Sequence, residues 1–201
     1  MPRLEEIIPG INLGNVSTDF PDPETNYLQV NLNHHLKYDR IDKETKELFD
    51  SFKDQVVIDL FSGPFLDVYR EACRARAIGY VAIDLFSEFT EVNCLGKSDN
   101  YNKSRVDEYN IERHIPAFFK GEDSLMFLKR LPSNSVSIHI SGAGFCFFNN
   151  YDYKRAVEKE IERVLHSSGA YIGHATEIVP SKLKLAGGKL GFLDVFKLSK
   201  D

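Results

Sequence analysis

Residues 55–86 read QVVIDLFSGPFLDVYREACRARAIGYVAIDLF, and this stretch decides the fold. Two apolar runs, at residues 56–58 and 80–83, flank a Ser-Gly-Pro turn and a segment whose apolar residues have helical spacing. Unbroken apolar runs are typical of strands that are buried on both faces of a parallel sheet. Gly79 is a natural stop for the helix between them. The stretch therefore predicts a right-handed strand-helix-strand unit.

Each predicted strand of this unit carries an aspartate close to its end. Asp59 follows the first apolar run, and Asp84 follows the second. In open α/β sheets, ligands bind in the crevice outside the carboxyl ends of the strands. We therefore expect the functional site at this edge of the sheet. The alternative role of each aspartate is to cap the turn that follows it.

The remainder of the chain continues the alternation of strands and helices. The apolar patterns predict three more strands separated by helices, and then a short helix, a turn and a single last strand. These elements are expected at residues 116–123 (strand), 124–131 (helix), 136–140 (strand), 152–165 (helix), 170–172 (start of a strand), 181–185 (helix) and 191–198 (strand). Such alternation predicts an α/β fold with a doubly wound, mostly parallel, Rossmann-like sheet and helices on both faces.

Residues 1–51 differ from the rest of the chain in composition. They are rich in Asn, Asp and Pro, and PDPETN at residues 21–26 is a cluster of turn formers. Within this segment we expect a short strand at residues 27–32 and a helix at residues 42–52. We interpret residues 1–51 as an N-terminal extension that packs on a core domain formed by residues 52–201.

The overall composition is that of an ordinary globular protein. The chain has 201 residues, 42% of them hydrophobic, which is enough for one large core. Its net charge of −5 argues against a general nucleic-acid binder, since such proteins are more often basic, and leaves only a local patch for RNA. The three cysteines form no CxxC pair, which favours reduced thiols over a disulfide framework or a metal site.

The sequence also bears on localisation. The start, MPRLEEIIPG, lacks the basic-then-apolar pattern of a signal peptide. No apolar run approaches the roughly 20 residues that a membrane-spanning helix needs. We therefore expect a cytoplasmic protein that has no membrane segment.

Four motifs, in order along residues 56–174, resemble those of the class I methyltransferases that use S-adenosylmethionine (SAM). VIDLFSG resembles the first motif of that superfamily, and YVAIDLF resembles the second. KGEDSLMFLKRLPSNSVSIHISG is similar to the segment that contacts adenine and leads into the fourth strand. EIERVLHSSGAYI is similar to the helix, turn and fifth strand that follow.

The resemblance implies SAM as the cofactor, S-adenosylhomocysteine (SAH) as its product, and a set of cofactor-binding residues. A turn of small residues lets backbone N–H groups approach the methionine carboxylate. Asp84 would accept hydrogen bonds from the two ribose hydroxyls, and Asp123 would lie by the adenine unless it only caps the next helix. The implied cofactor-binding residues are Asp59, Ser62, Gly63, Asp84, Leu85, Asp123, Ser124, Ser141 and Gly142.

The implied activity is methyl transfer to a small molecule. SGAGFCFF after the fourth predicted strand lacks the Asn-Pro-Pro-Tyr pattern of enzymes that methylate amide or base nitrogens, which favours a small-molecule acceptor. His174 follows the fifth strand at the ligand edge and is the predicted general base, because an imidazole titrates near neutrality. His139 lies inside the fourth strand, where we expect it to be buried and satisfied.

Three departures from the family pattern support an alternative function. The turn has Phe61, Gly63 and Phe65 where the family usually has three glycines, and Pro64 removes one N–H donor. The tail contains one convincing strand instead of the usual antiparallel final hairpin. The alternative is a methyltransferase-like binding or scaffold protein without transfer activity. A Rossmann-like enzyme that uses another nucleotide is disfavoured because GxGxxG is absent.

Overall fold

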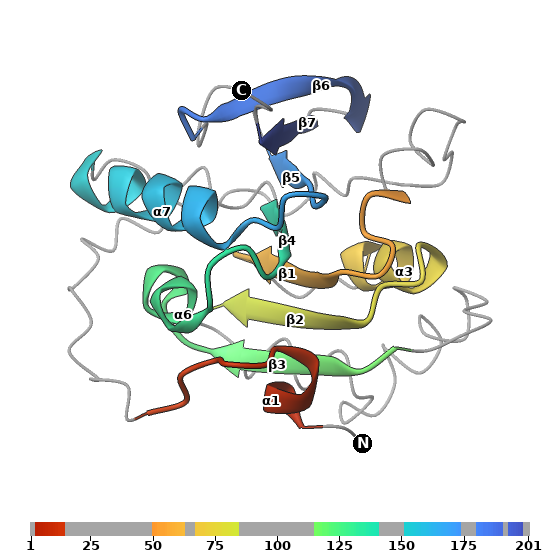
Figure 1. The fold of residues 1–201 in the computed structure, drawn as a ribbon, viewed down its shortest axis with the longest axis vertical. Coiled ribbons are helices and arrows are strands. Elements are labelled where there is room, and N and C mark those ends of the chain that lie inside the picture. Colours follow the sequence, from red (N-terminus) through yellow and green to blue (C-terminus); the bar gives the residue numbers. More distant parts are fainter. Residues whose placement is uncertain are drawn as a thin grey trace, which may run out of the picture.

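The computed structural model describes residues 3–14, 50–62, 67–84, 115–140, 151–173, 180–190 and 193–198. Five strands run parallel, and two further strands form an antiparallel hairpin at one edge. They are β1 (Val56–Leu60), β2 (Gly79–Asp84), β3 (Ala117–Gly121), β4 (Ser137–Ile140), β5 (Tyr171–Gly173), β6 (Leu183–Leu190) and β7 (Leu193–Leu198). Together they form one seven-stranded sheet in the order β3-β2-β1-β4-β5-β7-β6 (Figure 1).

The central strand-helix-strand unit is confirmed, but Gly79 does not end its helix, because the helix ends at Arg74 and Gly79 is the first residue of β2. All five residues of β1 are buried, as expected of a strand that is covered on both faces. Helix α3 (Asp67–Arg74) connects β1 to β2, and the two strands pair in parallel with Val56 opposite Gly79. The predicted parallel α/β architecture is therefore correct.

Helices cover both faces of the sheet, and each face has its own core (Figure 1). Val57 and Tyr80 pack with residues of α3 on one face. Ile58 and Leu60 belong to the core of the other face, which is covered by α1 (Leu4–Ile7), α6 (Ser124–Arg130) and α7 (Tyr151–Val164). Successive residues of β1 thus alternate between the two cores, as the pleat of a strand requires.

The N-terminal segment contributes to the second of these cores. Leu4, Ile7 and Ile8 are buried there. Asn12 N–H donates to the carbonyl of Arg130 at 3.0 Å, which fastens the segment beside the end of α6. Most of the predicted extension, including the strand at residues 27–32 and nearly all of the helix at residues 42–52, lies outside the described residues.

In the tail, the predicted last strand is confirmed as β7, but the predicted helix and turn before it were wrong. Residues 181–185 do not form a helix, because β6 begins at Leu183 and pairs antiparallel with β7. The register shifts between Leu185 and Lys189, around Gly187 and Gly188, so the glycines lie within the strand instead of ending an element. Glycines inside a strand often mark such an irregularity. The chain therefore has the antiparallel hairpin that the sequence pattern failed to indicate.

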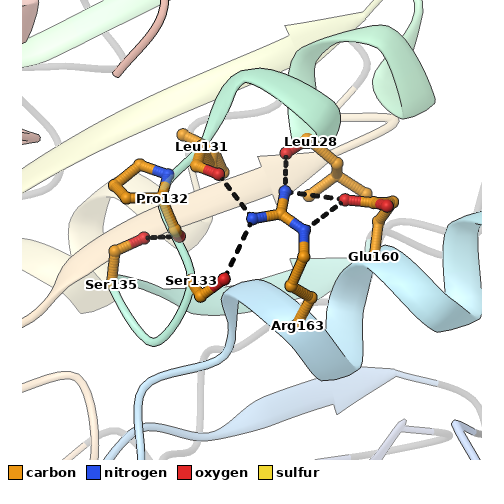
Figure 2. A network of polar contacts seen from close by, with 7 residues as sticks. All are labelled: Leu128, Leu131, Pro132, Ser133, Ser135, Glu160 and Arg163. Carbon is orange, nitrogen blue, oxygen red and sulfur yellow. Dashed lines mark hydrogen bonds and ion pairs between the residues drawn. The ribbon is translucent and has the colours of Figure 1, made fainter. Parts of the chain in front are cut away.

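Arg163 of α7 forms hydrogen bonds to the end of α6 (Figure 2). The guanidinium of Arg163 donates to the carbonyls of Leu128 and Leu131 at 2.9 and 2.7 Å, at the end of α6. The same group pairs with Glu160 on its own helix at 2.7 Å. A cation is favourable at a helix C-terminus, where carbonyls lack intrahelical partners. No helix in the described part of the chain is long and apolar enough to cross a membrane.

Candidate functional site

The strand order reverses between β1 and β4, and polar residues meet at this point. From β1 the chain continues to β2 and β3 on one side, whereas β4 and β5 lie on the other. Such a topological switch point is where open α/β sheets bind ligands. The register places Asp59 of β1 directly opposite His139 of β4.

Asp59 is fully buried and forms hydrogen bonds to side chains of both neighbouring strands. Its Oδ2 accepts from the Tyr80 hydroxyl at 2.7 Å, and its Oδ1 lies 3.0 Å from Nδ1 of His139. An ionised carboxylate only accepts, so this contact is a hydrogen bond in the ring forms of His139 that carry a proton on Nδ1. Nε2 of His139 is buried and has no hydrogen-bond partner among the described residues. His139 is thus buried as predicted, but the described residues satisfy only one of its ring nitrogens.

The turn after β1 begins with an unusual backbone conformation. Phe61 has a φ of 55°, in the left-handed region that glycine adopts without strain. Its side chain is buried in the core beneath α1, α6 and α7. Ser62 is also buried, and its N–H donates to the carbonyl of Ile83 on β2 at 3.2 Å. Phe61 thus has a backbone conformation typical of glycine.

Asp123 has the structural role that the sequence left open. Its Oδ1 accepts from the N–H of Met126 at 2.9 Å and caps α6, and its Oδ2 accepts from the Tyr153 hydroxyl at 2.8 Å. Burial and then the charge of Asp123 raise the pKa of Tyr153 far above its usual value, so its hydroxyl remains a donor. A carboxylate has about four acceptor positions, so Asp123 keeps capacity for a ligand. Its predicted contact with adenine remains a prediction.

The predicted cofactor residues that the structure describes lie along one edge of the sheet. Asp59 and Ser62 lie at the end of β1, Asp84 ends β2 opposite Gly121, and Asp123 and Ser124 follow β3. The side chain of Asp84 lies outside the described structure. The remaining predicted residues also lie outside it: Gly63, Leu85, Ser141, Gly142 and His174.

Two residues of this region were missed by the sequence reasoning. The sequence patterns place Tyr80 in a buried strand and Tyr153 in the helix at residues 152–165, with no polar role for either. A signal for Tyr80 exists in hindsight, because a tyrosine buried at a strand position needs a partner for its hydroxyl. Within the described ranges, no three His, Cys, Asp or Glu side chains gather into a possible metal site.

The fold was compared with known proteins. The sequence matches no protein-family model and no curated protein. Among solved structures, yhhF from Escherichia coli, which is named as a methyltransferase, is similar with a TM-score of 0.52 and 14% identity, over 80% of this chain and 87% of that one. This chain has the class I methyltransferase fold.

Two further structures show weaker similarity to this methyltransferase fold. A protein from Anaeromyxobacter dehalogenans, named as a type II methyltransferase, has a TM-score of 0.41 and 11% identity over 63% of this chain. A SAM-dependent methyltransferase from Thiobacillus denitrificans, solved with SAH, has a TM-score of 0.40 and 15% identity over 64% of this chain. This chain spans only 44% and 46% of their respective lengths.

Proposed function

We propose that the protein is a SAM-dependent methyltransferase that acts on a small molecule. The observation that carries the proposal is the row of acidic residues at one edge of a methyltransferase fold, which ends at the switch point of the sheet. Asp123 follows β3, Asp84 is the last residue of β2, and Asp59 lies one residue before the end of β1, and the three strands are neighbours in that order. SAM is an elongated ligand in which adenine, ribose and methionine follow one another, so three adjacent strand ends suit its three parts.

The residues present fit this cofactor in two respects. At Phe61, the first residue after β1, the backbone has the left-handed conformation that glycine adopts without strain, in agreement with a glycine-rich motif. Asp123 retains acceptor positions beyond those used by Met126 and Tyr153. When bound, SAM supplies an electrophilic methyl group.

The proposed roles follow the order of the strands. Asp123 and Ser124 hold the adenine, Asp84 and Leu85 hold the ribose, and the turn at Ser62 and Gly63 receives the methionine part. Ser141 and Gly142 line the transfer centre, and His174 removes the proton of the acceptor. Most of the rate enhancement would come from the positioning of the two reactants.

The alternative of an inactive binding or scaffold protein loses one of its arguments. One argument for it is that the sequence pattern of the tail indicates only one strand. The structure contains the final antiparallel hairpin, which is formed by β6 and β7. The substitution of glycine by Phe61 is accommodated by the backbone. Pro64 and Phe65 remain the features that favour the alternative.

Calorimetric titration with SAM and SAH tests the proposal. The folded wild type is expected to bind both with micromolar dissociation constants, and Asp84→Ala is expected to abolish binding. Glu5→Ala, which removes an exposed carboxylate from α1, is the matched control and should bind as the wild type does. If the folded wild type binds neither ligand at millimolar concentration, the proposal is wrong.

Transfer and acceptor class are tested by the release of SAH from SAM. The enzyme is incubated with SAM and either the low-molecular-mass filtrate of a cell extract or the retained macromolecules. SAH formation that depends on the filtrate supports a small-molecule acceptor. Formation only with the retained fraction contradicts that part of the proposal, and binding without formation in either fraction favours the inactive alternative.

A further inference from the structure

Tyr80 and His139 reach Asp59 from the two strands that flank β1. His139 lies directly opposite Asp59, and Tyr80 lies opposite Val57, two residues earlier on the same face of the strand. The ring of Tyr80 also packs on Tyr69 of α3, with 5.5 Å between ring centroids. The two donors therefore approach the carboxylate of Asp59 from opposite sides, each at a different oxygen.

This network fixes the direction of the Asp59 carboxylate. A buried carboxylate is very costly unless it is hydrogen-bonded, so each lost donor would let it turn toward another partner. Tyr80 and His139 are themselves held by their strands, and both side chains are buried. The carboxylate thus has rigid donors at both oxygens.

The same network is not optimised for stability. Nε2 of His139 is buried and finds no partner in the part of the chain that the structure describes, and a buried nitrogen that lacks a hydrogen bond costs free energy. An apolar residue would avoid this cost in the middle of a sheet. Departures from local stability tend to occur at functional sites, and this one lies at the switch point of the sheet.

We propose that Tyr80 and His139 are positioning residues, which orient Asp59 beneath the turn that binds the methionine part of the cofactor. The inference rests on the proposed function. Asp59 lies three residues before Ser62 and on the strand that leads into the turn. Both residues act through Asp59, so neither should matter for cofactor binding once its carboxylate is removed.

SAH binding to a set of variants tests this dependence. Tyr80→Phe removes one hydroxyl and keeps the ring. His139→Leu removes the donor to Asp59, whereas His139→Asn keeps an N–H donor close to the position of Nδ1 and removes Nε2. Each variant is made in the wild type and in Asp59→Asn, and all are titrated at a temperature at which circular dichroism shows them folded.

The expected pattern is distinct from that of a merely structural role. Tyr80→Phe and His139→Leu should each weaken SAH binding by about tenfold, the equivalent of one hydrogen bond. His139→Asn should restore affinity to within about threefold of the wild type. In the Asp59→Asn background, the same changes should alter the affinity by less than about twofold, since coupled residues are not additive.

The results that would contradict the positioning role differ from the result that would contradict the proposed function. If the wild type binds SAH and both Tyr80→Phe and His139→Leu bind it equally well, the positioning role is wrong and the proposed function stands. Equal losses in the wild-type and Asp59→Asn backgrounds would also exclude action through Asp59. If the folded wild type does not bind SAH at all, the proposed function itself fails.

Discussion

Replacing Phe61 by glycine and, separately, by alanine distinguishes the strain of its backbone from the burial of its ring. Phe61 has a φ of 55° and an exposed fraction of 8%. Both replacements remove the same buried ring, which should cost about 3–5 kcal/mol of the free energy of unfolding. They differ in how well each new residue tolerates the left-handed backbone.

The difference between the two variants follows from that conformation. A left-handed backbone costs an L-residue such as alanine roughly 1–2 kcal/mol, and glycine avoids this cost. Glycine loses about 0.5–1 kcal/mol more conformational entropy on folding than alanine does. At Phe61, glycine should therefore be more stable than alanine by about 0.75 kcal/mol, the difference between the middle values of the two ranges. This order is the reverse of the usual one.

Phe127 provides the matched control. It is fully buried and lies inside α6, where glycine should be less stable than alanine by about 1 kcal/mol. Urea unfolding of the four variants gives the two differences, which should have opposite signs. If Phe61→Gly is less stable than Phe61→Ala by the same margin as at Phe127, the left-handed turn and the argument built on it are wrong.

Two further predictions concern the packing of α6 against α7. Arg163→Met should lower the free energy of unfolding by about 2 kcal/mol, because charged hydrogen bonds to two carbonyls of α6 are lost. Glu160→Gln, which weakens only the ion pair, should cost less than about 1 kcal/mol in the same urea titration, and equal losses would contradict the capping role. For Tyr153, the raised pKa means that the folded state holds its proton more tightly than the unfolded state, whose value is 10.0. Tyr153 therefore contributes fully to the free energy of unfolding below that pH, and its contribution is lost as the pH rises above it. Between about pH 8 and about pH 11, the free energy of unfolding should fall less in Tyr153→Phe than in the wild type.

The central unit was predictable because its signals are local. The apolar runs of β1 and β2 are short, unbroken and separated by a segment with helical spacing, so chain order and period suffice. The tail was not predictable in the same way. Gly187 and Gly188 interrupt β6 at a register shift, which hides the alternation that would indicate a strand.

In the candidate site, too, the local features were predictable and the contacts between distant residues were not. Asp59 and Asp84 were predictable, since an acidic residue at the end of a buried strand is visible in the sequence. The contacts of Asp59 with Tyr80 and His139 were not, because they depend on register between strands that lie 21 and 80 residues apart in the chain. Asp123 was predictable in part. Its position before α6 indicates that it caps this helix, whereas nothing in the sequence indicates its hydrogen bond with Tyr153.

The direction of the Phe61 side chain explains how a glycine-rich turn can contain this residue. Along β1, Val57 lies in the core on the α3 face, and the alternation would direct Phe61 toward that face too. Instead, Phe61 packs in the opposite core with Ile58 and Leu60. The left-handed backbone at residue 61 breaks the alternation and turns the ring away from the face on which Asp59 lies. Although Phe61 replaces a glycine of the family pattern, its ring therefore does not lie on the face of β1 that carries Asp59. The strain of the left-handed backbone is offset by burial of the ring in the opposite core.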